Sequence, residues 1–166
     1  MARLLGRDHE SKDEEDMVSD LEPSSDHDLF EDLEQADIII LGVQRTTKRP
    51  TAKYLIKEGF VVRCLIFDCT RGIPKEITSL PNNPLVVGLA KGPDQVVWVR
   101  KSMRDMRLHF SERYFDVDVI DANLRAFRAV CAANEWKVID VDGPISKTAD
   151  EIIKLYRQRE QAKRIA

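Results

Sequence analysis

The sequence has few of the features that define membrane, secreted or fibrous proteins. Its three cysteines, Cys64, Cys69 and Cys131, form no close pair, which argues against a disulfide scaffold and favours a reducing compartment. No apolar run approaches the ~20 residues that a membrane-spanning helix needs. The first residues are acidic and contain no apolar stretch of a secretory signal. Seven glycines and seven prolines in 166 residues exclude a collagen-like or linker-like chain.

The charges are divided unevenly along the chain. The formal net charge is -3, but residues 1–37 hold 14 acidic and 3 basic side chains, whereas residues 38–166 hold 15 and 23. We interpret residues 1–32 as an acidic, mobile leader, because they have few apolar side chains and contain the turn-forming segment 22–28. The alternative is an acidic tail that competes with ligands for a basic body.

The apolar segments predict one α/β domain over residues 33–166, with a mostly parallel sheet flanked by helices. Short, continuously apolar runs are typical of strands that are buried on both faces. Such runs occupy residues 36–43, 60–67, 84–89 and 136–141. Helices are expected over residues 50–58, 93–108 and 116–133, and from Ser146, as helix cap, to the C-terminal end. The clearest helix face is that of Ile120, Leu124, Phe127 and Cys131.

A basic loop between the first expected strand and the first expected helix is the strongest candidate for chemistry. Gly42 and Lys48 have the spacing of the phosphate-binding pattern G-x-x-x-x-G-K-[ST], but Thr47 replaces its second glycine and Arg49 its final hydroxyl residue. A helix N-terminus with basic neighbours favours an anion. An ordinary basic surface loop fits the same residues, so both interpretations stay open.

The segment around this loop resembles one family of proteins. Residues 36–55 read ADIIILGVQRTTKRPTAKYL. The regulatory proteins of pyruvate, phosphate dikinase and of phosphoenolpyruvate synthase carry the similar pattern A-D-[IV]-[IV]-L-[IV]-G-V-S-R-T-[SG]-K-T-P. Shorter similarities follow in order over residues 87–89, 99–104 and 136–149, so the resemblance spans about residues 33–156.

The resemblance implies a bifunctional phosphotransferase with a P-loop-like nucleotide-binding domain. Such proteins inactivate the dikinase or the synthase by phosphorylating a threonine with ADP as donor. They restore it by a phosphate-dependent phosphorolysis that yields pyrophosphate. The expected ligands are therefore ADP, with ATP as an alternative, and inorganic phosphate, while a role for Mg²⁺ stays open. The dikinase or the synthase is the expected partner, the cytoplasm is the expected compartment, and a homodimer is compatible with the family.

The resemblance also implies roles for individual residues. Lys48 would stabilise charge on the transferred phosphoryl group, and Asp26 would correspond to an acid of the family's D-D-G segment, as a candidate acid or base. Arg100 and Arg104 are candidate phosphate contacts, since guanidinium groups pair well with phosphate oxygens. The expected nucleotide- and phosphate-binding residues are Gly42, Val43, Gln44, Arg45, Thr46, Thr47, Lys48 and Arg49.

Departures from the family pattern leave a second hypothesis open. The family has a threonine where this chain has Arg49, and an arginine cannot coordinate Mg²⁺. Family members are also longer and have an N-terminal domain. The sequence therefore leaves three interpretations open: a divergent active enzyme, a fragment, or a degenerate relative that binds nucleotide, phosphate or the dikinase without catalysis.

Two further functions have weaker support in the sequence. A nucleic-acid module ranks third, because the basic body lacks interleaved aromatic side chains; Arg100 and Arg104 also fit a solvated basic helix face. We expect no metal site, because the three histidines do not have the spacing of metal ligands. These histidines are His9, His27 and His109.

Overall fold

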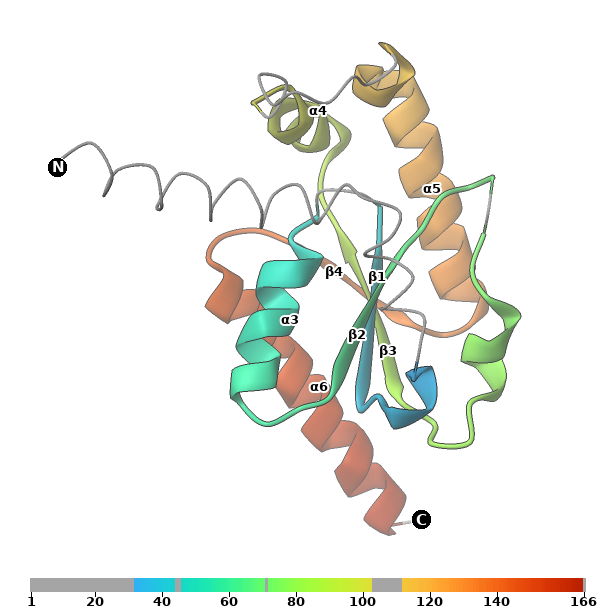
Figure 1. The fold of residues 1–166 in the computed structure, drawn as a ribbon, viewed down its shortest axis with the longest axis vertical. Helices are drawn as coiled ribbons and strands as arrows, with labels where there is room; N and C mark the ends of the chain where they lie inside the picture. The colour runs from blue at the N-terminus through green and yellow to red at the C-terminus, as the bar shows by residue number, and fades with distance from the viewer. Residues whose placement is uncertain (1–31, 44–45, 71, 103–111, 166) are drawn as a thin grey trace, which may run out of the picture.

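The computed structural model describes residues 32–43, 46–70, 72–102 and 112–165. These residues form a four-stranded sheet with helices packed on both faces (Figure 1). The leader expected over residues 1–32 lies outside the described residues except for Asp32, and four of the candidate site residues also lie outside them. These four are Asp26, Gln44, Arg45 and Arg104.

All four strands run parallel, in the order β2-β1-β3-β4. The four apolar segments of the sequence form these strands, so the predicted α/β fold with a parallel sheet is confirmed. Ile40, at the centre of β1, lies opposite Cys64 of β2 and Val87 of β3. The strands are β1 (Ile38–Gly42), β2 (Val62–Ile66), β3 (Leu85–Ala90) and β4 (Lys137–Asp140).

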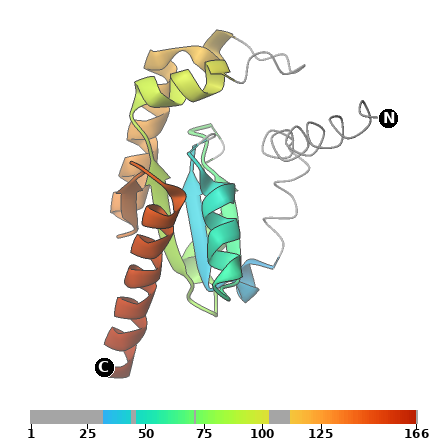
Figure 2. The same ribbon diagram turned by 90° about the vertical axis from the view of Figure 1, so that its left-hand side faces the viewer.

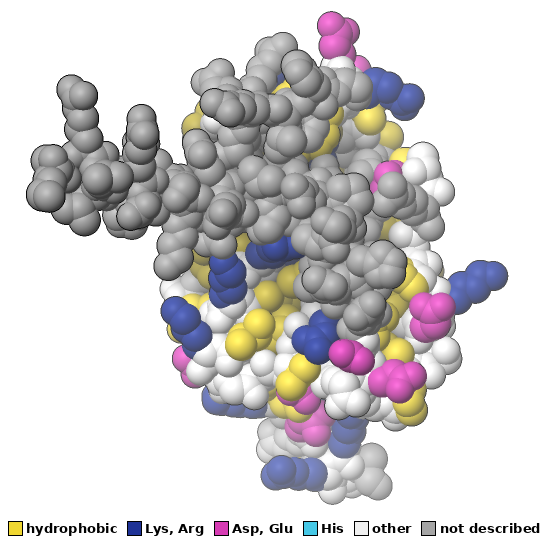
Figure 3. Space-filling view, in the orientation of Figure 1, with side chains coloured by type: hydrophobic (Ala, Val, Ile, Leu, Met, Phe, Trp, Pro, Cys, Tyr) yellow, Lys and Arg dark blue, Asp and Glu magenta, His cyan; other side chains and the backbone are white. Residues whose placement is uncertain are grey.

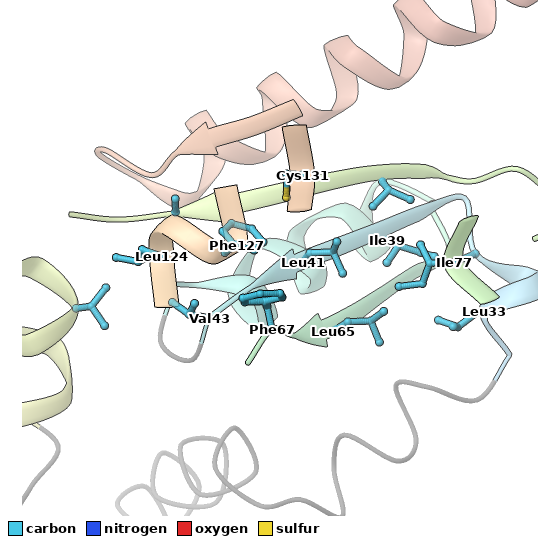
Figure 4. Packing of buried hydrophobic residues seen from close by; sticks show 14 of the residues in the cluster. Leu33, Ile39, Leu41, Val43, Leu65, Phe67, Ile77, Leu124, Phe127 and Cys131 are labelled. Atoms are coloured by element: carbon cyan, nitrogen blue, oxygen red, sulfur yellow. The ribbon is translucent and has the colours of Figure 1, made fainter. Parts of the chain in front are cut away.

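The central strand β1 is buried on both faces, because its side chains alternate between two hydrophobic clusters. Ile39 and Leu41 belong to one cluster, whereas Ile38 and Ile40 belong to the other. Figure 4 shows the first cluster, in which the rings of Phe67 and Phe127 pack with their centroids 5.5 Å apart. The unbroken apolar runs of the sequence therefore reflect a sheet that is covered on both sides.

Helices α3 (Lys48–Lys57) and α6 (Ile145–Ile165) cover one face of the sheet and contact each other. Helix α5 (Val117–Ala133) and the 3-10 helix η2 (Lys75–Ser79) cover the other face. The four residues predicted to share one face of α5 are all buried against the sheet, so that prediction is confirmed. They are Ile120, Leu124, Phe127 and Cys131.

Two helix starts differ from those expected. Helix α3 begins at Lys48 rather than at Pro50, so the lysine of the loop is already helical. The prediction of Ser146 as a helix cap is wrong, because α6 begins at Ile145. Gly143 has a φ of 91° and turns the chain ahead of this residue, and the Lys147 N–H donates to the Pro144 carbonyl at 3.1 Å.

The smaller elements connect the sheet to its helices. Helix α4 (Pro93–Ser102) follows β3, and the expected helix beyond it, over residues 103–108, lies outside the described residues. Two short 3-10 helices, η1 (Leu33–Gln35) and η3 (Glu112–Phe115), precede β1 and α5. The Asp116 carboxylate caps α5 by accepting from the N–H groups of Asp118 and Val119.

The connections bring several loops to one edge of the sheet. β1 leads to α3 on one face, whereas its neighbour β3 leads through α4 to α5 on the other face. In open α/β sheets, ligands bind outside the carboxyl ends of the strands at such a point of divergence. Helix α4 lies beyond these carboxyl ends in both ribbon views (Figures 1 and 2).

The surface shows mixed charge and one projecting helix end. On the described part of the face in Figure 3, Lys and Arg side chains are interspersed with acidic, apolar and uncharged ones. The C-terminal end of α6 extends past the sheet in both ribbon views, and Ile165 is 81% exposed (Figures 1 and 2). Within the described ranges, no helix combines the length and the apolar character needed to cross a membrane.

Candidate functional site

Gly42, the last residue of β1, lets Thr46 and the neighbouring strand β3 lie close to its backbone. A Cβ atom at this position would lie 2.6 Å from Thr46 Oγ1 and 2.9 Å from the Leu89 carbonyl oxygen. Both distances are shorter than a methyl group tolerates, and the carbonyl belongs to the backbone of the neighbouring strand β3. A residue without a side chain is therefore required where β1 ends.

Lys48, the first residue of α3, turns its side chain back towards Val43 and Thr46. The residue is buried, and its Nζ donates to the Val43 carbonyl at 2.6 Å and to Thr46 Oγ1 at 3.4 Å. Thr46 is fully buried, and its hydroxyl donates to the same Val43 carbonyl at 2.9 Å. A buried ammonium group thus lies between the end of β1 and the N-terminus of α3, where an anion is also favoured by the helix dipole.

Thr47 has a backbone conformation that favours glycine. Its φ is 62° and its ψ is 26°, which is the left-handed region that a β-branched residue rarely adopts. This is the position at which the phosphate-binding pattern has its second glycine. Thr47 therefore holds this conformation at a cost of about 1–3 kcal/mol.

Hydroxyl groups of the loop bind its own backbone. Thr47 Oγ1 donates to the Thr46 carbonyl at 2.6 Å, and Thr51 Oγ1 donates to the Thr47 carbonyl at 2.7 Å. On the sheet side, Cys64 Sγ lies 3.6 Å from the Lys48 carbonyl as a weak donor. These contacts hold the start of α3 in one position relative to β1 and β2.

A pocket of about 280 Å³ lies beside this loop, at the carboxyl ends of β3 and β4. Thr47 contributes to its wall from the loop, Lys91 follows β3 directly, and Asp142 follows β4. Burial lowers the pKa of Lys91 below its ordinary value. The remaining lining residues come from α4, the segment after β4 and the start of α6. They are Gln95, Trp98, Val99, Val141, Gly143 and Ile145.

Arg100 faces a neighbouring helix rather than this pocket. The side chain is buried, one of its terminal nitrogens donates to the Tyr114 carbonyl at 2.7 Å, and its guanidinium carbon lies 4.2 Å from the centre of the Tyr114 ring. These contacts join α4 to η3. The structure places Arg100 in this contact, and its role as a phosphate contact stays a prediction.

The remaining expected site residues fall into two groups. Gly42, Val43, Thr46, Thr47, Lys48 and Arg49 lie together at the end of β1 and the start of α3. Arg49 is half-buried in the first turn of the helix. Asp26, Gln44, Arg45 and Arg104 lie outside the described residues, so their positions relative to the loop stay predictions. Within the described ranges, no three histidine, cysteine or acidic side chains are grouped as metal ligands.

The comparison with protein families decides where this chain belongs. A family model described as kinase/pyrophosphorylase matches residues 24–153. The chain belongs to the kinase/pyrophosphorylase family. The matched segment includes the loop after β1, the whole sheet and the residues around the pocket, so the site described above lies within the part that defines membership.

Curated relatives of this kinase/pyrophosphorylase chain carry the provisional name of pyruvate, phosphate dikinase regulatory protein. The one from Sphingopyxis alaskensis is 37% identical over 135 residues, which cover 80% of this chain and 50% of the relative. The one from Neorickettsia sennetsu is 35% identical over 130 residues, 77% of this chain and 48% of the relative. The one from Pelagibacter ubique is 32% identical over 133 residues, 79% of this chain and 48% of the relative. The chain thus spans about half the length of the curated relatives it matches.

Sequence reasoning did not find the pocket residues of this kinase/pyrophosphorylase chain. Lys91, Trp98 and Asp142 carry no motif, and they meet only because β3 and β4 end beside the loop that follows β1. One signal was present in the sequence, because Lys91 and Asp142 are charged residues within two positions of the ends of predicted parallel strands. Such positions share an edge of the sheet.

Proposed function

We propose that the chain provides the nucleotide-binding part of an ADP-dependent protein serine/threonine kinase and phosphate-dependent pyrophosphorylase. Its target would be pyruvate, phosphate dikinase or phosphoenolpyruvate synthase. In the forward reaction the β-phosphoryl group of ADP would move to a threonine hydroxyl, and AMP would leave. In the reverse regulation, inorganic phosphate would attack the phosphothreonine and release pyrophosphate. Membership of the kinase/pyrophosphorylase family and the names of the relatives support this proposal.

The buried Lys48 is the observation on which the proposal rests. Its Nζ lies between the end of β1 and the N-terminus of α3, 2.6 Å from the Val43 carbonyl. Phosphoryl transfer is catalysed largely by positioning and by charge stabilisation. A cation fixed at a helix N-terminus supplies both for a phosphate group, and Gly42 allows the backbone to approach closely.

The residues of the loop fit phosphate better than they fit a magnesium ion. The loop offers an ammonium group, backbone N–H groups at a helix start and no carboxylate among residues 42, 43 and 46–49. Mg²⁺ is usually held by carboxylates, substrate phosphates and water, and the threonine of the family pattern is replaced here by Arg49. Lys48 and Arg49 would hold nucleotide phosphates in our proposal, while Mg²⁺, where it is required, would have to be ligated mainly by the nucleotide and water.

The same replacement supports a second candidate function. If the family's threonine hydroxyl is needed for metal-assisted transfer, the chain with Arg49 would bind ADP or phosphate without catalysing transfer. Replacement of Arg49 by threonine separates the two candidates. We expect Arg49→Thr to raise the phosphotransfer rate of an active enzyme, and an unchanged rate would mean that the hydroxyl is not limiting.

The proposed function is tested by calorimetric titration of ADP into the purified chain, with and without Mg²⁺. We expect Lys48→Met, which keeps the buried aliphatic stem, to weaken ADP about 10- to 100-fold, since a charge-assisted hydrogen bond contributes about 1.5–3 kcal/mol. Lys57→Met, in the last turn of the same helix, is the matched control and should leave the affinity unchanged. Equal ADP affinity of wild type and Lys48→Met would overturn the loop assignment.

A positive titration is followed by a transfer assay. Labelled ADP would be incubated with the chain and each candidate target, and phosphothreonine would be detected on the target protein. Binding without transfer on either target would favour the non-catalytic candidate.

A further inference from the structure

We propose that the pocket beside the loop binds the nucleoside part of the nucleotide, with Trp98 as the surface on which the base stacks. This inference rests on the proposed function, because it takes the phosphates to bind at Lys48. It adds a binding subsite and a residue that discriminates a nucleotide from a bare phosphate or pyrophosphate.

The position of the pocket supports this assignment. Thr47 lines the pocket and also precedes Lys48, so one residue borders both the pocket and the loop. A ligand with its phosphates at the N-terminus of α3 would therefore extend directly into the pocket. The volume of about 280 Å³ is close to the lower limit of roughly 300 Å³ for small-molecule sites, which suits a nucleoside rather than a protein segment.

The exposure of Trp98 is unusual for so large an apolar side chain. Trp98 is 72% exposed, although it lies on a helix whose neighbouring residues Val96 and Arg100 are buried. Tryptophan at a protein surface is commonly a binding residue, because its flat ring gains much from covering an apolar partner. A nucleobase has two such faces, and stacking of bases on aromatic side chains is tolerant of base type.

The other lining groups favour an uncharged ligand part. Val99, Val141 and Ile145 provide apolar walls. The Asp142 carboxylate would repel a phosphate but can accept hydrogen bonds from ribose hydroxyls, and the Gln95 amide can both donate to and accept from a base. Positive charge is thus concentrated at Lys48 and Lys91, while the α4 side of the pocket offers apolar and hydrogen-bonding groups.

The experiment compares ADP with pyrophosphate, which has no nucleoside, on three forms of the full chain. Both ligands are titrated into wild type, Trp98→Ala and Trp98→Phe by calorimetry. We expect Trp98→Ala to weaken ADP about 5- to 100-fold, the usual effect of removing a stacking ring, and to leave pyrophosphate affinity unchanged. Trp98→Phe, which keeps a ring, should recover most of the ADP affinity.

A spectroscopic readout complements the titration. The chain has two tryptophans, and Trp136→Phe leaves Trp98 as the sole tryptophan emitter. In that background we expect ADP, but not pyrophosphate, to quench the fluorescence of Trp98.

The outcomes separate this inference from the proposed function. If wild type binds ADP and Trp98→Ala binds it equally well, the nucleoside subsite is overturned and the phosphate site stands; a loss of target-protein binding in that variant would instead assign the pocket to the protein substrate. If Trp98→Ala weakens ADP and pyrophosphate alike, Trp98 acts on the loop and the subsite is also overturned. If wild type binds neither ligand, both proposals fail.

Discussion

At the scale of single residues, backbone conformation reveals more about the loop than residue type does. Thr47 stands where the phosphate-binding pattern has glycine, so residue type alone makes the sequence a weaker match to that pattern. Its φ of 62° nevertheless lies in the region that favours glycine. Thr47 thus adopts a conformation that glycine adopts readily and that a β-branched residue disfavours.

We expect Thr47→Gly to stabilise the fold by about 1 kcal/mol, since relief of strain exceeds the entropy of an added glycine. Thermal unfolding would measure the change, and ADP titration would show whether the loop still binds. Glu135→Gly is the matched control, because Glu135 has a φ of 58° at the end of α5, far from the loop along the chain. Both variants should gain stability, and a loss in Thr47→Gly alone would show that its hydroxyl outweighs the strain.

The cysteines should differ sharply in reactivity. Cys131 is fully buried and burial raises its pKa to about 11, against the opposing effect of Arg128. At pH 8 roughly one Cys131 in a thousand would be thiolate, whereas Cys69 is exposed. A thiol reagent at pH 8 should therefore modify one cysteine quickly in the native chain and three after unfolding.

The same raised pKa makes stability depend on pH. The unfolded thiol ionises near pH 9 and the folded one near pH 11. Because the unfolded chain loses this proton first, the contribution of Cys131 to the free energy of unfolding is complete below pH 9 and is lost as the pH rises towards 11. The measurement is the free energy of unfolding of wild type and of Cys131→Ala between pH 9 and pH 11. The variant should lose less stability over this window, and parallel losses would contradict the assignment.

At the scale of secondary-structure elements, α4 is the element that links the fold to the site. It begins after β3, carries Trp98 and Val99 on the pocket wall, and is joined to η3 through Arg100 and Tyr114. The position of the pocket wall therefore depends on the contact between Arg100 of α4 and Tyr114 of η3. Arg100 makes this contact in the structure, and its expected contact with a phosphate stays a prediction.

We expect Arg100→Ala to destabilise the ligand-free chain by about 2 kcal/mol, because it removes a charged hydrogen bond and a stacked cation. Lys101→Ala, at an exposed neighbouring position, is the control and should have little effect. Denaturant unfolding of both variants is the measurement. Unchanged stability together with weaker ADP binding would return Arg100 to the role of a phosphate contact.

The secondary-structure elements could be predicted from the sequence, whereas the contacts between their loops could not. The strands followed from unbroken apolar runs such as residues 38–41, and the buried face of α5 followed from its helical period. The hydrogen bond from Lys48 to the Val43 carbonyl and the position of Trp98 and Asp142 on one pocket wall could not be predicted. A local hydrophobic pattern indicates which side chains are buried. Contacts between loops depend on the order of the strands in the sheet, which a local pattern does not predict.

At the scale of the whole molecule, the described residues form one parallel sheet between two hydrophobic clusters, with the candidate site at a single edge. The chain belongs to the kinase/pyrophosphorylase family and spans about half the length of the curated relatives it matches. Within that half, the loop, the pocket and the helix that bounds it are all present. Nucleotide binding is therefore the activity to measure first on this chain.

The strand order has a consequence for how binding and folding depend on each other. Thr47, Lys91 and Asp142 are dozens of residues apart, and they become neighbours only when β1, β3 and β4 have paired. A peptide of residues 36–58 would carry the loop but none of the pocket. A ligand that fills the site would bind only the folded chain and stabilise it by about 2.7 kcal/mol at a concentration of 100 Kd. The melting temperature itself would then report occupancy.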